Sequence, residues 1–167
     1  MSQRIDNAIN ITRRIIDDMR PAILDDLGLL AAIEWQAGEF CQRTGIDCLV
    51  NCIEDEANLD KQRSIALFRI LQETLTNISR HSRASKVKIE FLHSEDEILL
   101  TVSDNGCGIS ESLGTTKKLY RSKSYGMLGM KERVEQLGGK IIFSSPHGGG
   151  LSVQVILPLP AGERSIQ

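Results

Sequence analysis

Two consecutive apolar segments separated by a short polar turn place the strongest limit on the fold of this chain. Residues 86–93 (KVKIEFLH) and 97–104 (EILLTVSD) are rich in β-branched and aliphatic side chains and are bounded by polar residues, which is typical of strands. A connection this short joins antiparallel strands, because parallel neighbours need a long crossover. A second pair of strands is expected at 140–145 and 151–160. A purely parallel sheet is therefore disfavoured.

Helical periodicity supplies the remaining elements. Apolar residues recur at helical spacing between charged ones in several segments, and a further strand is expected at 46–52. Asp60 is placed to cap the longest of these helices. The order of elements predicts a two-layer α/β sandwich: a mixed sheet with helices on one face, preceded by a helical extension. The helices are expected at 4–20, 25–43, 61–81 and 129–138.

Composition narrows the class of protein. The chain has 167 residues, of which 41% are hydrophobic and 25% charged, as in one globular domain with a short appended element. A net charge of −2 argues against a dedicated nucleic-acid binder, which normally carries a basic excess. Neither a secretory leader nor an apolar run of roughly 18 to 20 residues is visible, so we expect a cytoplasmic chain. Membrane attachment of a longer parent protein is left open.

The helix at 61–81 carries a polar row opposite its apolar stripe. Glu73, Asn77 and His81 follow one another at intervals of four residues and therefore share one side of the helix. Such a row is most often a solvated face. Ala66 and Ile70 on the same side instead suggest that the row is partly covered. A carboxylate can orient an attacking group, and an amide oxygen is a hard ligand suited to Mg²⁺ beside phosphates.

The stretch SDNGCGI at 103–109 admits two interpretations. Asn105-Gly106 is a strong hairpin signal, so Asp104 could simply precede a turn. The residues that follow, however, form a long loop rich in Ser, Thr, Gly and Lys, without the alternation of a second strand. A buried carboxylate only accepts hydrogen bonds, so the exocyclic amine of adenine is a natural partner, and Gly106 and Gly108 would let a flat base approach the backbone.

The loop at 110–124 and the segment after it could bind phosphate. The loop carries Lys117 and other cations, and Gly126 and Gly129 are expected to precede a helix whose amino end would favour anions. A basic solvated loop followed by a helix cap explains the same pattern equally well. The standard phosphate-binding loops are absent from the sequence. The segment SPHGGG at 145–150 is most simply a hairpin turn, although it could also line a base pocket.

Three of these segments, taken in order, resemble a known family. LFRILQETLTNISRHS, VSDNGCGI and YGMLGMKERVEQLGG resemble the N, G1 and G2 boxes of the GHKL ATPase superfamily, specifically the catalytic domain of sensor histidine kinases. The resemblance covers about 46–160. The upstream MRPAILDDLGLLAAIEWQAGEF is similar to the end of the dimerisation domain in the subfamily that signals to response regulators with helix-turn-helix outputs.

The resemblance implies a Bergerat fold, ATP with Mg²⁺, and transfer of the γ-phosphoryl group to a histidine. It implies Glu73, Asn77 and His81 as catalytic residues, with Asn77 and Glu73 at the metal. Asp104 would bind adenine N6. The other implied nucleotide-binding residues, besides Asn77, are Gly106, Gly108, Ile109, Lys117, Tyr125, Gly126, Leu128, Gly129 and Met130.

The resemblance also implies the organisation and partners of the chain. Residues 1–43 would be the dimerisation-domain remnant and junction, 44–160 the catalytic domain and 161–167 a tail. None of His81, His93 and His147 lies in the sequence context of a phosphoacceptor, so we expect the acceptor to be supplied by a dimerisation domain outside this chain. The expected partners are that domain, a response regulator and, through residues 4–20, a second copy. The alternatives are an anti-sigma serine kinase of the same superfamily and a nucleotide-binding scaffold without catalysis.

Overall fold

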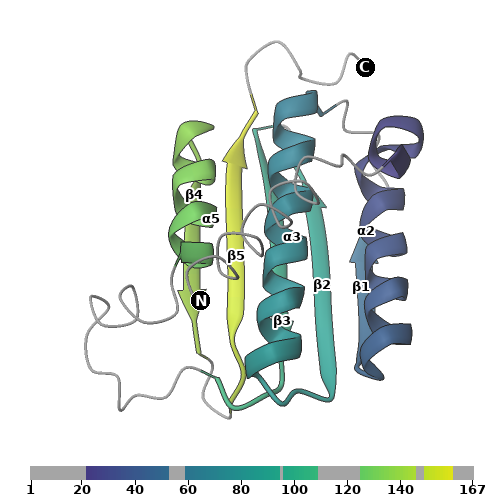
Figure 1. Cartoon of the computed structure of the whole chain (residues 1–167). Coiled ribbons are helices and arrows are strands. Elements are labelled where there is room, and N and C mark those ends of the chain that lie inside the picture. Colours follow the sequence, from purple (N-terminus) through teal and green to yellow (C-terminus); the bar gives the residue numbers. More distant parts are fainter. Residues whose placement is uncertain (1–21, 53–58, 95, 109–124, 146–148, 160–167) are drawn as a thin grey trace, which may run out of the picture.

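The computed structural model describes residues 22–52, 59–94, 96–108, 125–145 and 149–159. Within these ranges the chain forms a single mixed sheet and helices that lie on one of its faces (Figure 1). The predicted helix at 4–20 and the loop at 110–124 lie outside the described residues. The elements are α2 (Ala22–Thr44), β1 (Asp47–Cys52), α3 (Lys61–His81), β2 (Lys86–His93), β3 (Glu97–Asp104), α5 (Tyr125–Gln136), β4 (Lys140–Ser144) and β5 (Ser152–Pro158).

The sheet has the strand order β1-β2-β3-β5-β4. β1 runs parallel to β2, and the remaining neighbours are antiparallel. The two predicted hairpins, β2–β3 and β4–β5, are therefore confirmed, and so is the mixed sheet. β3 is the central strand, and its carboxyl end brings Asp104 between β2 and β5.

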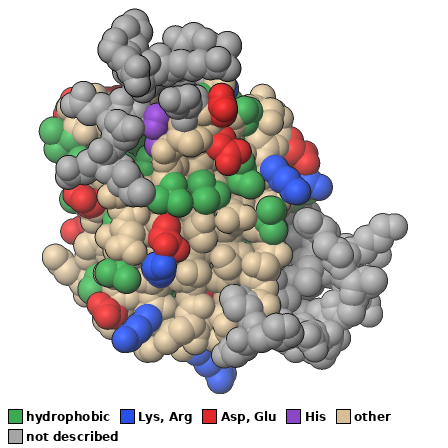
Figure 2. All heavy atoms as spheres, turned by 180° about the vertical axis from the view of Figure 1, so that it is seen from behind, with side chains coloured by type: hydrophobic (Ala, Val, Ile, Leu, Met, Phe, Trp, Pro, Cys, Tyr) green, Lys and Arg blue, Asp and Glu red, His purple; other side chains and the backbone are tan. Residues whose placement is uncertain are grey.

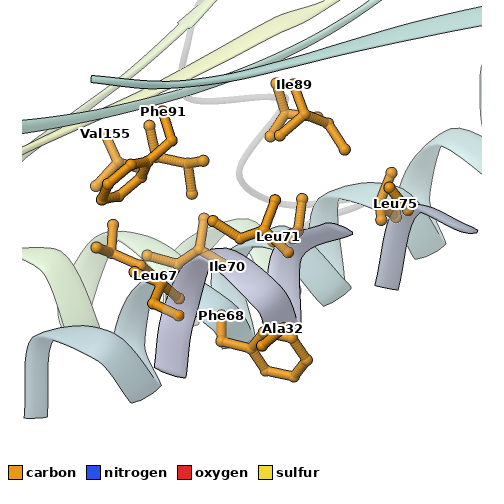
Figure 3. Close-up of a cluster of buried hydrophobic side chains, with 14 of the residues drawn as sticks. Ala32, Leu67, Phe68, Ile70, Leu71, Leu75, Ile89, Phe91 and Val155 are labelled. Atoms are coloured by element: carbon orange, nitrogen blue, oxygen red, sulfur yellow. The ribbon is translucent and has the colours of Figure 1, made fainter. Parts of the chain in front are cut away.

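The hydrophobic core lies between the sheet and α3, which is flanked by α2 on one side and α5 on the other (Figure 1). Phe91 and Val155 point from the sheet toward Leu67 and Ile70 of α3 (Figure 3). Phe68 turns the other way, toward Ala32 of α2. Helix α2 thus shares one hydrophobic core with α3 and the sheet, while the domain boundary placed at 43 stays a prediction.

Helix α3 begins and ends as the sequence predicts. Asp60 caps its first turn by accepting the N–H of Arg63 at 2.9 Å and pairing with the Arg63 guanidinium. Burial raises the pKa of Asp60, but the hydrogen bonds from Arg63 outweigh it, so the pKa lies below its ordinary value. At the other end, the Ser82 hydroxyl donates to the Ile78 carbonyl and accepts the N–H of Ala84, which closes the helix.

Two helices differ from their predicted limits. α2 begins at Ala22 and is kinked at Gly28, whose φ of 84° lies in the left-handed region that favours glycine. α5 begins at Tyr125, so the expectation that Gly126 and Gly129 precede the helix is wrong: both lie within its first turns. Glycine has a low helix propensity, but the first turns of α5 contact α3, where Gly126 lies against Glu73 and Met130 against Thr74.

The opposite face of the sheet is not covered by any described helix. A hydrophobic band crosses it among polar and charged side chains (Figure 2). Leu92, Leu99 and Ile156 are neighbours in register across three strands, and Leu99 alternates with the buried Ile98 and Leu100 of β3. Of these, Leu92 is 38% exposed.

Candidate functional site

The polar row runs along α3 toward its carboxyl end, on which the loop after β3 packs. Glu73 and Asn77 are half-buried, whereas His81, at the last residue of the helix, is exposed. Ala66 and Ile70 are buried, as expected from their place on the covered side. Within the described residues, neither Glu73 nor Asn77 has a hydrogen-bond or ion-pair partner. No described residue satisfies their oxygens.

Glu73 also contacts the first turn of α5. A Cβ added to Gly126 would overlap the carboxylate oxygen Oε1 of Glu73, so the absence of a side chain at 126 makes room for the carboxylate. One residue further along α3, the hydroxyl of Thr74 donates to the sulfur of Met130 at 3.7 Å. Met130 is buried and belongs to the hydrophobic core, so its side chain packs α5 against the rest of the domain. The structure thus brings the predicted metal-binding helix against the predicted phosphate-binding helix.

The Asp104 carboxylate closes a turn with one of its two oxygen atoms, Oδ1. Its side-chain oxygen Oδ1 accepts the N–H of Gly106 at 2.7 Å, which forms a local turn of the kind common for Asp. The residue is 8% exposed. Within the described residues, the carboxylate accepts no other hydrogen bond. The next described element after β3 is the helix α5, so this turn does not lead into an adjacent strand of a hairpin.

Gly106 is required by packing inside the protein. A Cβ at this position would overlap the carbonyl oxygen of Ser82, at the end of α3. The same carbonyl accepts the N–H of Cys107 at 2.8 Å. Gly106 therefore allows the loop after β3 to lie directly on the carboxyl end of α3. The sequence predicted this glycine for a turn or for contact with a base, and the structure adds its packing on Ser82.

Asn105 and Ser82 are structural members of the site that the sequence interpretation missed. The Asn105 side-chain oxygen accepts the N–H groups of Ser85 and Lys86, each at 2.9 Å, and its amide donates to the Ser85 hydroxyl. These bonds join the loop after β3 to the start of β2. The only signal in the sequence was the Asn-Gly pair, which indicates a turn but does not reveal its distant partners.

The connection between β4 and β5 packs against the loop that follows β3. A Cβ at Gly108 would lie 2.6 Å from both the Gly150 carbonyl oxygen and the Ser145 hydroxyl. Gly150, with φ of 88°, packs so closely that a Cβ there would overlap the carbonyl oxygen of Asp104. The segment predicted as a hairpin turn does connect β4 to β5, and its second suggested role, next to the base site, is compatible with this position.

The remaining predicted residues are placed as follows. Ile109 and Lys117 lie outside the described residues, and of Tyr125 only the backbone is described. Leu128 is 43% exposed on α5. Gly129 is half-buried, and a Cβ there would meet open space. The described residues contain no group of His, Cys, Asp or Glu side chains that could by itself hold a metal ion, so a metal at Asn77 would need ligands from the nucleotide or water.

Comparisons with known proteins identify the family. Residues 62–161 match the family described as histidine kinase-, DNA gyrase B-, and HSP90-like ATPases. The chain is 33% identical over 147 residues to the sensor histidine kinase MctS of Rhizobium johnstonii, covering 88% of this chain and 31% of that protein. It is 31% identical over 163 residues to the histidine-protein kinase/phosphatase DegS of Brevibacillus brevis, covering 98% of this chain and 41% of that protein.

Solved structures show the same fold. The histidine kinase AdeS of Acinetobacter baumannii aligns with a TM-score of 0.66 at 16% identity, covering 93% of this chain and 82% of that chain. A blue-light activated histidine kinase of Erythrobacter litoralis aligns with a TM-score of 0.63 at 22% identity, covering 78% of this chain and 45% of that chain.

The fold and the family match define an ATPase of the GHKL type. The chain belongs to the family of histidine kinase-, DNA gyrase B-, and HSP90-like ATPases. ATP is accordingly the ligand that this membership supports. The chain spans less than half the length of the curated relatives described above. Among the described helices, none combines the length and apolar character needed to cross a membrane.

Proposed function

We propose that this chain is the ATP-binding catalytic part of a two-component sensor histidine kinase. Its role would be to pass the γ-phosphoryl group of ATP to a histidine on a dimerisation domain, for relay to a response regulator with a helix-turn-helix output. The observation that carries the proposal is the packing of the loop that follows Asp104 on the carboxyl end of α3, the helix that carries Glu73 and Asn77. Each of these three side chains has oxygen atoms that no described residue satisfies. Similarity to sensor kinases over most of this chain supports it.

Asp104 would recognise the base. A buried carboxylate with an open oxygen needs a hydrogen-bond donor, and adenine supplies one through its exocyclic amine. The Gly106 N–H already occupies Oδ1 and fixes the direction of the carboxylate. The side chain is therefore held in one orientation before the base arrives, which lowers the entropic cost of recognition.

Asn77 and Glu73 fit a Mg²⁺ site beside the phosphates. Mg²⁺ favours hard oxygen ligands, keeps several waters and commonly borrows phosphate oxygens, so one amide oxygen and a neighbouring carboxylate are sufficient protein contributions. Both groups are half-buried and without partners in the described residues. When bound, the ion would neutralise charge that develops on the transferred phosphoryl group.

The other residues would position and orient. Glu73 would polarise the attacking group, and it lies at the amino end of α5, where the helix dipole favours negative charge. His81, exposed at the end of α3, would be reachable by an incoming acceptor. Lys117 and the neighbouring cations of the loop at 110–124 would contact the phosphates. Little covalent chemistry is then required of the protein, because phosphoryl transfer depends mainly on positioning and charge stabilisation.

The substitution Asp104→Asn tests the base assignment. Asparagine keeps the shape of the side chain and can still accept the Gly106 N–H, but it turns the open oxygen into an amide donor facing the adenine amine. We expect the affinity for a non-hydrolysable ATP analogue, measured by calorimetry, to fall about ten- to a hundredfold. The urea-unfolding midpoint should stay unchanged. The control is Asp47→Asn, an exposed carboxylate on β1. Equal analogue affinity in the wild type and Asp104→Asn would refute the assignment.

A further inference from the structure

Strand β4 forms one edge of the sheet. In the strand order β1-β2-β3-β5-β4 it pairs with β5, and no other described strand lies beside it (Figure 1). The backbone N–H and C=O groups on its outer side therefore have no strand partner within the described residues. Such groups are a template for a further strand, and proteins usually protect an edge with charges, proline or a bulge.

The sequence of β4 has little of this protection. The strand KIIFS contains no proline, and its one charged residue is Lys140 at the first position. Its register with β5 is continuous, so no bulge turns the strand away from a partner. The other edge of the sheet is more polar, because β1 carries Asp47 and Asn51 beside Leu49 on its exposed face.

The hydrophobic core is incomplete at this edge. Ile141 and Phe143 are opposite Val155 and Val153 of β5, which are buried. Both side chains pack against the core, yet both are only half-buried. Ile142 points to the opposite face of the sheet and is half-buried as well. All three apolar side chains of the strand thus keep exposed area where no described strand covers them.

We propose that β4 pairs antiparallel with β4 of a second copy of this chain, about a two-fold axis at Ile142, and so joins two sheets into one. In this register Lys140 of each copy is opposite Ser144 of the other, so like charges do not meet. Ile141 is opposite Phe143, and Ile142 is opposite its own counterpart. A parallel pairing in register would instead place the two Lys140 side chains against each other.

The complementarity of the strand with itself assigns the edge to a second copy. One surface used by both partners is the usual form of a two-fold interface. A five-residue strand makes a small interface, so a concentration-dependent equilibrium between monomer and dimer is expected rather than a permanent dimer. The inference does not depend on nucleotide binding, and it differs from pairing through residues 4–20.

The test places a charge on the two-fold axis. Ile142→Lys sets two ammonium groups directly opposite each other, and sedimentation equilibrium of the full chain measures the dissociation constant. We expect the substitution to raise it at least about tenfold. The control is Gln154→Lys, which adds the same charge to the same face one strand further in. Its counterpart would lie about 14 Å away, beyond the screening length, so the control should change little.

A charge swap distinguishes this interface from any other. Ile142→Glu should associate as weakly as Ile142→Lys when alone, and an equal mixture of the two variants should regain the affinity of the wild type. A dimer held together by residues 4–20 would respond to neither substitution. Wild-type chains that stay monomeric at every concentration, or a dimer that Ile142→Lys leaves unchanged, would overturn the proposal.

Hydrogen exchange on the wild type keeps the test independent of how the variants fold. Amides of residues 140–144 should exchange more slowly as the protein concentration rises, because pairing protects the outer groups of β4. Amides of β1, at the other edge, provide the internal control and should not change. Exchange in β4 that is the same at low and high concentration would overturn the proposal, as would protection that appears in β1 instead.

Discussion

Replacing Asn77 with alanine is expected to remove the Mg²⁺ dependence of nucleotide binding and to lower phosphotransfer about a hundredfold or more. The reason is that the amide oxygen of Asn77 is the neutral hard ligand that the helix α3 offers at the site, and the alanine methyl group cannot replace it. The side chain is half-buried and has no partner in the described residues, so its loss should leave the fold intact.

The measurement has two parts. Binding of a non-hydrolysable ATP analogue is followed with and without Mg²⁺, and phosphotransfer is followed to a separately supplied dimerisation domain. Asn51→Ala serves as the control, because Asn51 is exposed on β1. The substitution should leave Mg²⁺-free binding of the analogue nearly unchanged, since Asp104 would still hold the base. A variant with unchanged Mg-ATP affinity and transfer would contradict the role of Asn77. A wild type that binds ATP but transfers nothing would favour a nucleotide-binding scaffold.

Gly106→Ala is expected to affect folding and binding together. The new methyl group would overlap the Ser82 carbonyl oxygen and lie 2.8 Å from Oδ1 of Asp104. The loop must move, which breaks the Cys107 N–H bond to Ser82 and turns Asp104 away from the site. We expect the free energy of unfolding to drop by about 2–4 kcal/mol. Binding of the ATP analogue should become undetectable.

Gly38→Ala is the matched control for this experiment. Gly38 lies within helix α2, and a Cβ there meets nothing within 4 Å. Alanine favours the helix over glycine, so the control should stabilise the chain by about 0.5–1 kcal/mol. Urea unfolding of both variants gives the comparison. If Gly106→Ala were as stable as the wild type and bound the analogue normally, the close packing of the loop against Ser82 would not be needed.

Much of the architecture follows from local sequence patterns. The strands β2 and β3 alternate or run apolar between polar turns, and the capping residue Asp60 marks the start of α3. These signals act over a few residues, so they do not depend on contacts with distant parts of the chain. The placement of Asp104 at the end of β3 followed from the same reasoning, because the apolar strand ends there.

The contacts that build the site depend on distant parts of the chain. The sequence gives no local sign that Gly106 lies on Ser82, or that Gly126 makes room for Glu73. The predicted start of α5 was late, because the contact between Thr74 of α3 and Met130 of α5 has no signal in the sequence around α5.

The central claim, that Asp104 and α3 form an adenine-specific site assisted by Mg²⁺, is tested most directly by titrating the wild-type chain. Calorimetry with a non-hydrolysable ATP analogue, with and without Mg²⁺, is compared with the same titration using a GTP analogue. We predict saturable binding of the ATP analogue, strengthened by Mg²⁺, and at least about tenfold weaker binding of the GTP analogue. Equal affinity for the two analogues, or no binding of either, would contradict the account.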